Sequence, residues 1–217
     1  MLNTKVLEML NAGRIDELKK MLEDEIYEES LKIKPGAKKR YAAMKKYFKY
    51  HKTVRECLQK PCRVVFEDKD YISFTNSWSL ALTTENCGEI ELWDESNCKY
   101  PDVTRLLRFD GIKKKLNLRE VIAEAKRKGY RLNKKEVDSE FTYLLLFDGT
   151  YYKIGLLDAT YSIIDNGEIA MTYHPDGERM PLTIKNEIGI CMIMPVKYDQ
   201  GIDPEEDGKI VIRIDVE

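Results

Sequence analysis

Apolar residues three and four positions apart predict helices in the first quarter of the chain. Residues 14 to 31 carry such a stripe, made of Ile15, Leu18, Leu22 and Ile26. A shorter helix is expected before the break at Asn11-Ala-Gly13. A third helix is predicted after Pro35-Gly36, from Ala37 to Lys52, with an apolar side of Tyr41, Met44 and Phe48. The N-terminal part is therefore expected to be helical.

After Pro61 the pattern changes to short runs of β-branched and aromatic residues. These runs predict an antiparallel meander with strands at 63–66, 71–75 and 78–83. The expected turns are Asp68-Lys-Asp70 and Asn76-Ser77. Residues 84 to 100 are polar and irregular, which indicates a loop with one edge strand at Glu89 to Trp93.

The second half of the chain adds two helices and more strands. Asn117 and Glu120 have the spacing of a helix N-cap and its reciprocal partner, and that helix is expected to end at Gly129. Within residues 141 to 196 the pattern predicts one strand, one helix and three antiparallel strands, in that order. The predicted fold class is therefore α+β, with an antiparallel sheet that carries helices on one face.

Length and composition narrow the class of protein. A chain of 217 residues with 43% hydrophobic content can bury a core without disulfide staples, so its five irregularly spaced cysteines are expected to be reduced thiols. The N-terminus has no apolar signal region, and no stretch of eighteen or more apolar residues occurs. We therefore expect a cytoplasmic protein without a membrane partner.

The net charge is only −2, but the charged residues are unevenly distributed along the chain. Eleven basic residues lie between Lys32 and Lys60, against the single acid Glu56, and a second basic block runs from Lys113 to Lys135. Two interpretations of these blocks stay open: a surface that binds nucleic acid, or an ordinary solvated lysine face.

Several segments carry motifs in a recognisable order, and the first two are Phe74-Thr-Asn-Ser-Trp-Ser-Leu-Ala81 and Tyr100-Pro-Asp-Val-Thr-Arg-Leu106. They resemble a strand, and the linker that enters the third domain, of the bacterial DNA polymerase sliding clamp family. Lys115-Leu-Asn-Leu-Arg-Glu120 is similar to the start of that domain's first helix. The end of the same domain is similar to Leu156-Leu-Asp-Ala159, Met180-Pro-Leu-Thr-Ile184 and Ile193-Met-Pro-Val-Lys197.

This resemblance implies a clamp-like fold of βαβββ units and a non-catalytic protein that needs no cofactor. It implies two partners, short peptides of replication proteins and double-stranded DNA bound without sequence preference, and a homo-oligomer as a further expectation. The implied peptide-binding residues are Thr75, Ser77, Leu80, Pro101, Arg105, Leu106, Met194, Pro195 and Val196. The implied DNA contacts are Lys38, Lys45, Lys49, Lys52, Arg119, Lys126 and Arg127. The alternative for the first set is a purely structural role in core and edge.

Three parts of the chain are expected on these grounds. Residues 1–53 form a helical N-terminal segment with the basic helix, and residues 54–198 form the clamp-like α+β domain. Residues 199–217 form an acidic extension with a terminal strand from Lys209 to Val216, and whether it covers the peptide-binding residues stays open.

Two other functions are weighed against this one. A phage or mobile-element accessory protein would use the same scaffold for protein–protein interaction alone, through its N-terminal helices. A metal-dependent nuclease would use the acid-x-Lys element Glu67-Asp-Lys69 together with Pro101-Asp102, although the order is reversed and a hairpin turn explains the first element better. A metal site could be proposed from Cys57, Cys62, Cys87, Cys98 and His51. These residues lack the close Cys-x-x-Cys spacing that is typical of structural zinc sites.

Overall fold

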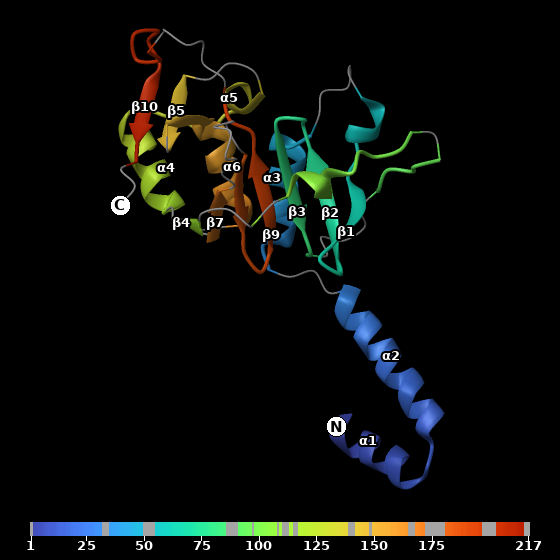
Figure 1. Cartoon of the computed structure of the whole chain (residues 1–217). Coiled ribbons are helices and arrows are strands. Elements are labelled where there is room, and N and C mark those ends of the chain that lie inside the picture. Colours follow the sequence, from blue (N-terminus) through green and yellow to red (C-terminus); the bar gives the residue numbers. More distant parts are fainter. Residues whose placement is uncertain are drawn as a thin grey trace.

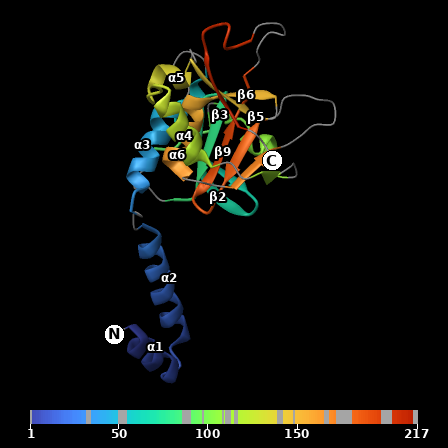
Figure 2. The same cartoon turned by 90° about the vertical axis from the view of Figure 1, so that its left-hand side faces the viewer.

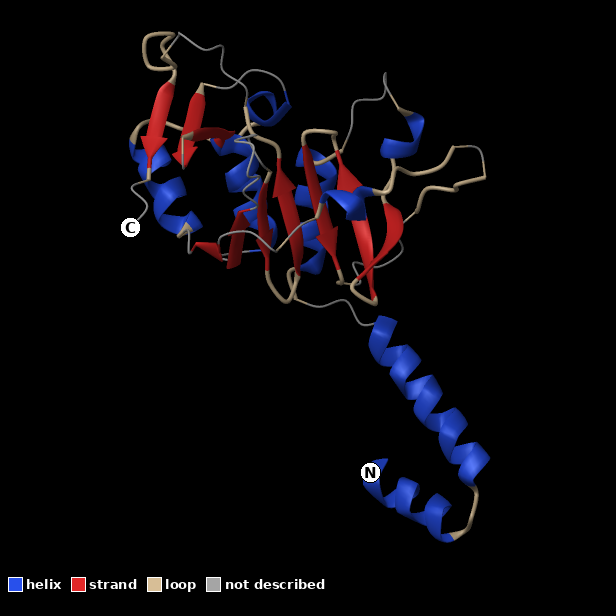
Figure 3. Cartoon of the chain, in the orientation of Figure 1, coloured by secondary structure: helices blue, strands red, loops and turns tan. Residues whose placement is uncertain are grey.

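The computed structural model of the chain describes residues 2–31, 35–49, 55–85, 91–96, 98–107, 109, 113–114, 117–138, 142–147, 149–164, 168–171, 181–196 and 203–214. Its helices are α1 (Leu2–Asn11), α2 (Ile15–Leu31), α3 (Ala37–Tyr47), α4 (Leu118–Arg127), α5 (Lys134–Asp138) and α6 (Ile154–Ile164), with short 3-10 helices η1 (Glu56–Leu58) and η2 (Val103–Leu106). Its strands are β1 (Cys62–Phe66), β2 (Lys69–Thr75), β3 (Ser79–Thr83), β4 (Lys113–Lys114), β5 (Tyr143–Phe147), β6 (Thr150–Lys153), β7 (Glu168–Met171), β8 (Leu182–Lys185), β9 (Gly189–Ile193) and β10 (Ile210–Arg213). Figures 1 and 3 show this arrangement.

A seven-stranded antiparallel sheet forms the centre of the molecule, in the order β1-β2-β3-β9-β8-β7-β4. Two parts of the chain more than a hundred residues apart meet where β3 pairs with β9, and Thr83 lies opposite Gly189 there. A Cβ at Gly189 would lie 2.1 Å from the carbonyl oxygen of Leu82, so only glycine allows the two backbones to approach this closely.

The helices α3, α4, α5 and α6 lie together on one face of this sheet (Figure 2). Helix α6 is apolar on nearly all sides and buried from Ile154 to Thr160, as expected for a helix enclosed by neighbours. It packs between α3, α4 and α5, and the main core forms between these helices and the sheet. The predicted α+β class and the placement of helices on one face are confirmed.

A second apolar cluster covers the opposite face of the sheet. Leu80, Leu82, Ile190 and Met192 point into it from β3 and β9. The cover consists of η1 and the segment from Tyr100 to Leu107, which contributes Tyr100, Val103 and Leu107. The hydroxyl groups of Tyr100 and Ser73 lie 3.1 Å apart, which fixes that segment on β2. The central strands β3 and β9 are therefore buried on both faces.

The central sheet consists of two copies of the same arrangement. In the first, α3 is followed by the meander β1-β2-β3, and in the second α6 is followed by the meander β7-β8-β9. The two helices have the same length of 11 residues and pack against each other. The two meanders join through their last strands, β3 and β9, so the sheet has approximate two-fold symmetry about this seam.

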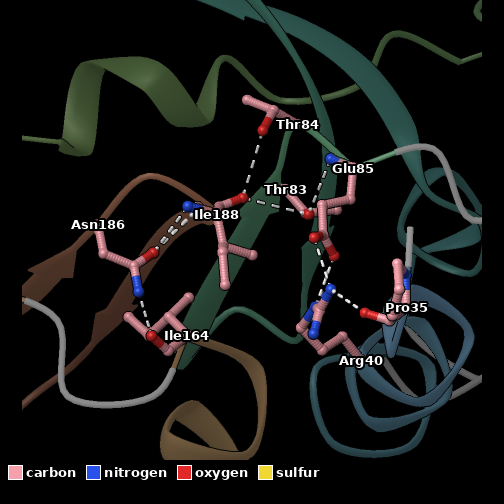
Figure 4. Close-up of polar contacts among 9 residues, drawn as sticks. Pro35, Arg40, Thr83, Thr84, Glu85, Ile164, Asn186 and Ile188 are labelled. Atoms are coloured by element: carbon pink, nitrogen blue, oxygen red, sulfur yellow. Dashed lines mark hydrogen bonds and ion pairs between the residues drawn. The ribbon is translucent and has the colours of Figure 1, made fainter. Parts of the chain in front are cut away.

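An asparagine at the equivalent turn of each copy makes the same set of hydrogen bonds. Asn76 Oδ1 accepts from the backbone N–H groups of Trp78 and Ser79 at 3.0 and 2.8 Å, while its Nδ2 donates to the carbonyl oxygen of Tyr47, the last residue of α3. Asn186 Oδ1 accepts from Ile188 and Gly189 at 2.9 and 3.2 Å, and its Nδ2 donates to Ile164, the last residue of α6 (Figure 4). Each asparagine therefore shapes a hairpin and caps a helix end.

A smaller three-stranded sheet has the order β10-β5-β6, in which β10 runs parallel to β5. The predicted strand before the helix is confirmed as β5, but a second strand, β6, which was not predicted, lies between it and the helix. The sequence pattern missed β6 because Lys153 passes into α6 at Ile154 without a breaker residue. Strand β10 lies beyond β5, away from β6 and from Val196, which bridges Tyr151 of β6. The terminal strand therefore lies apart from Val196, one of the predicted peptide-binding residues.

Helices α1 and α2 form a hairpin that extends away from the sheet and its helices (Figure 1). The predicted helices are confirmed, but the predicted buried stripe is not. Leu18 is buried, whereas Ile15 and Leu22 are exposed because the hairpin has too few neighbours to cover them. Among the described residues, no helix combines the length and the apolar character needed to cross a membrane.

Other boundaries differ from the prediction by small amounts. The β1–β2 turn is Glu67-Asp68, one residue earlier than expected, with both residues at positive φ as a two-residue hairpin requires. Residues 91–94 are not in a strand, and the rest of that predicted edge strand lies outside the described residues. The basic helix ends at Tyr47, and it packs into the main core with α6.

We predict that Asn76→Ala lowers the free energy of unfolding by about 2–3 kcal/mol, because it leaves buried backbone groups without partners. Asn186→Ala should cost somewhat less, since that side chain is only half-buried. The exposed Asn11→Ala variant, in α1, is the control and should change stability by less than about 0.5 kcal/mol. Urea unfolding followed by circular dichroism measures all three; equal effects for Asn76 and Asn11 would contradict the shared role.

Candidate functional site

Helix α3 divides cleanly into an apolar and a cationic side. Ala37, Met44 and Tyr47 are buried in the main core. Residues 37–49 contain no acid, and the lysines of this span lie on the solvent side: Lys38, Lys39, Lys45 and Lys46 are exposed, and Lys49 is half-buried. Lysines on a helix that is fixed by its other side form a rigid cationic surface.

Arg40 belongs to the basic block in the sequence but not to this surface. Its Nε and Nη2 atoms lie 2.5 Å from the two carboxylate oxygens of Glu85, and Nη2 also donates to the carbonyl oxygen of Pro35 at 3.1 Å (Figure 4). The Glu85 side chain is only 6% exposed. A paired guanidinium of this kind holds the start of α3 on the end of β3 and is not available to a ligand.

The predicted cations on α4 are partly neutralised by the protein itself. Lys126 Nζ lies 3.8 Å from the Asp158 carboxylate on α6, and Arg127 Nη2 lies 2.5 Å from Glu124 one helical turn earlier. Arg119 is exposed at the start of the same helix. Helix α4 lies on the same face of the sheet as α3, but its acids reduce its attraction for an anion.

Asp158 is a buried acid between α4 and α6. Burial raises the pKa of its carboxyl group, while the positive charge of Lys126 opposes that rise. The contact with Lys126 therefore compensates the removal of Asp158 from water. Lys126 has a structural partner as well as an exposed position.

The structure brings together three of the segments that carry the predicted peptide-binding residues. Leu80 on β3 and the segment from Pro101 to Leu107 meet in the second apolar cluster, and Met194 packs against the same cluster after the end of β9. Leu106, in the segment that enters this cluster, is 54% exposed, and Pro101, Met194 and Pro195 are half-buried. We call the partly accessible apolar residues of these segments, Leu106, Met194 and Pro195, the apolar surface.

The remaining predicted residues have other roles. Thr75 Oγ1 donates to the carbonyl oxygen of Ser79 at 2.8 Å, and Ser77 is exposed in the same turn at φ 70°. Val196 is buried beside β6, and Leu80 is almost fully buried, so neither is accessible to a peptide. Arg105 is exposed and paired with Asp102 at 2.7 Å.

Sequence reasoning missed Trp78 as a functional candidate. Its side chain is 59% exposed, and its carbonyl oxygen accepts a 2.8 Å hydrogen bond from the Met194 N–H, so its backbone adjoins the apolar surface. The sequence feature that could have identified Trp78 is its position directly after the predicted Asn76-Ser77 turn. A large apolar side chain at a turn has no neighbouring strand residue to cover it. Lys52 and His51, in contrast, lie outside the described residues.

The nuclease element has a structural explanation. Glu67 lies in the β1–β2 turn and pairs with Lys185 at 2.6 Å, while Asp102 pairs with Thr104 and Arg105. Within the part of the chain that the structure describes, which leaves out Cys87, no group of three or more ligating side chains could hold a metal ion.

The candidate site thus has two parts. The cationic side of α3 lies on one face of the central sheet, and the apolar surface lies on the other. A search of solved structures finds similarity to a DNA polymerase sliding clamp from Bacillus subtilis, with 13% sequence identity and a TM-score of 0.49. The match covers 76% of this chain and 63% of the clamp chain, less than two thirds of its length. No protein-family model and no curated protein matches the sequence. The similarity is one of fold alone.

The pair Lys126–Asp158 predicts a pH dependence of stability. An acid whose pKa is raised in the folded state stabilises the fold at low pH, and this contribution is lost as the pH rises through the folded-state pKa. Lys126→Ala should raise the Asp158 pKa further, so the variant should lose more stability than the wild type between pH 4 and pH 7. Urea unfolding at both pH values measures this difference. If the extra loss persists when Asp158→Asn is added, the pair is not its cause.

Proposed function

We propose that this protein is a non-catalytic, DNA-associated protein that contacts the phosphates of double-stranded DNA through α3. The observation that carries the proposal is the division of α3: its apolar side is fixed in the main core, and its solvent side carries lysines without an acid in residues 37–49. The resemblance of the sequence segments to the sliding clamp family supports the same function.

The spacing of the lysines fits a backbone ligand. Lys38 and Lys45 are seven residues apart, which places them along one stripe of α3, and Lys49 follows two residues after the last residue of the helix. An 11-residue helix is about 16 Å long, which is enough for contacts with several phosphates of one duplex. Lysine ammonium groups bind phosphate as point charges and read no base edges, so the expected affinity is weak, sensitive to salt and independent of sequence.

We predict that Lys38→Ala, Lys45→Ala and Lys49→Ala together reduce duplex affinity by roughly tenfold or more at low salt. They should also make the slope of log K against log salt shallower by about 2 to 3, since each phosphate contact contributes about 0.9. Fluorescence anisotropy with two labelled duplexes of unrelated sequence measures both quantities.

The matched control removes three cations from elsewhere: Lys60, Lys99 and Arg105, each changed to alanine. These residues are exposed and lie in segments that cover the other face of the sheet. The control triple has the same net charge as the α3 triple, so equal losses of affinity would show a general charge effect and contradict a site on α3. A strong preference for one duplex would contradict phosphate recognition.

We also propose that the apolar surface binds a short linear peptide. Leu106 exposes more than half of its side chain, and its segment packs on the same apolar cluster as the half-buried Met194. Pro195 follows Met194 and is half-buried, and Trp78, whose carbonyl oxygen accepts from the Met194 N–H, is exposed. Methionine and proline beside an exposed leucine and tryptophan give an adaptable apolar surface for a peptide's anchor residues. The resemblance to the clamp family supports a peptide from a replication protein.

We predict that Leu106→Ala and Met194→Ala together lower the affinity of the protein for a labelled clamp-binding peptide by at least about tenfold. These positions are accessible, so the double variant should keep its fold, whereas a change at buried Leu80 would also destabilise the core. Val65→Ala, at an exposed position on the edge strand β1, is the control and should bind as the wild type does. Absence of peptide binding by a folded wild type contradicts this proposal and leaves the DNA proposal unaffected.

A further inference from the structure

Two cysteines that are far apart in the sequence meet beside the second apolar cluster. Cys57 is buried in η1, and Cys98 is exposed in the segment that leads to Tyr100. The two thiols are neighbours, since Cys98 contributes to the raised pKa of the Cys57 thiol. Both are free thiols in this structure. In such a pair the accessible thiol is oxidised first, and the protected thiol then reacts with the oxidised sulfur to form a disulfide.

The contact is held by backbone and side-chain bonds around it. The Trp93 N–H donates to the carbonyl oxygen of Pro61 at 2.8 Å, and the Trp93 indole N–H donates to the carbonyl oxygen of Cys98 at 2.7 Å. An ion pair between Lys60 and Glu91 joins the same two segments. Trp93 thus connects the segment of Cys57 to the segment of Cys98. The hydrogen bonds of Trp93 and the ion pair of Lys60 hold the two cysteines near each other.

We propose that Cys57 and Cys98 form a reversible intramolecular disulfide when the protein meets hydrogen peroxide. In the first step the Cys98 thiol loses its proton to solvent, and the thiolate sulfur attacks one peroxide oxygen. The O–O bond breaks, and the hydroxide that leaves takes up a proton, so Cys98 sulfenic acid and water result. In the second step the Cys57 sulfur attacks the Cys98 sulfur and displaces a second water. Two thiols and one peroxide therefore give one disulfide and two waters, and each sulfur is oxidised while the peroxide is reduced.

The order of the two steps follows from burial. Burial raises the pKa of the Cys57 thiol, and the neighbouring Cys98 raises it further, so Cys57 stays protonated while the exposed Cys98 meets the oxidant. The disulfide would close a loop of about 40 residues and fix the segment that continues into Tyr100 and Val103. The inference is independent of the DNA and peptide proposals.

The test treats the full-length protein with a small excess of hydrogen peroxide and maps its peptides by mass spectrometry without reduction. The expected product is a cross-linked Cys57–Cys98 peptide pair, two hydrogens lighter than the separate peptides and released by dithiothreitol. Cys62→Ser should give the same product, because Cys62 is a nearby buried thiol that the reaction does not use. Cys57→Ser should instead leave Cys98 as a sulfenic acid that reacts with dimedone.

Three outcomes would overturn the proposal. Cys98 could accumulate as a sulfenic or higher acid in the wild type without a cross-link, it could cross-link to a cysteine other than Cys57, or both thiols could remain unreacted under excess peroxide. Circular dichroism of each variant checks that the fold is retained. If Cys57→Ser does not fold, the wild type and Cys62→Ser still decide between these outcomes.

Discussion

The pairing of β3 with β9 is the contact on which the rest of the structure depends. It joins two helix-and-meander units into one sheet, and Gly189 permits it because any larger residue would meet the Leu82 carbonyl group. At one end of this seam, Thr83 and Thr84 donate to the carbonyl oxygen of Ile188, and Glu85 beside them holds Arg40 (Figure 4). On the other side Asn186 reaches the end of α6. A continuous set of polar contacts thus ties α6, the seam and the start of α3 together.

This arrangement explains why α3 can serve as both a core element and a cationic surface. A buried ion pair contributes little net stability but fixes geometry, and loss of either partner is costly. Arg40 is therefore used for position, which leaves the lysines of the same helix for solvent or a ligand. Asn76 fixes the opposite end of α3. A helix held at both ends and along its apolar side presents its lysines with little loss of conformational entropy on binding.

Local pattern predicted most of the fold because most elements obey local rules. The Asn117 cap is confirmed by its hydrogen bond from the Glu120 N–H, and the apolar run of α6 is confirmed as a helix. The parts that were missed depend on long-range contacts. No local signal indicates that β5 and β6 leave the central sheet and pair with β10, or that Arg40 meets a glutamate 45 residues later.

The order of the clamp-like motifs in the sequence predicted which segments of the chain form the candidate site. The motif resemblance placed Leu80, Leu106 and Met194 in one region, and the structure brings their segments together. It could not separate accessible residues from buried ones, because Leu80 and Leu106 are equally apolar and only packing distinguishes them. Trp78 and the contact of Cys57 with Cys98 were missed for the same reason: both depend on which segments cover the second face of the sheet.

The most direct test of the central claim, that α3 is the surface that meets DNA, is lysine footprinting. The protein is acetylated briefly at low salt with and without duplex DNA, and the modification of each lysine is measured by mass spectrometry. The account predicts that DNA protects Lys38, Lys45 and Lys49 and leaves Lys60 and Lys99 unchanged. Protection of Lys60 and Lys99 with no protection on α3 would contradict it.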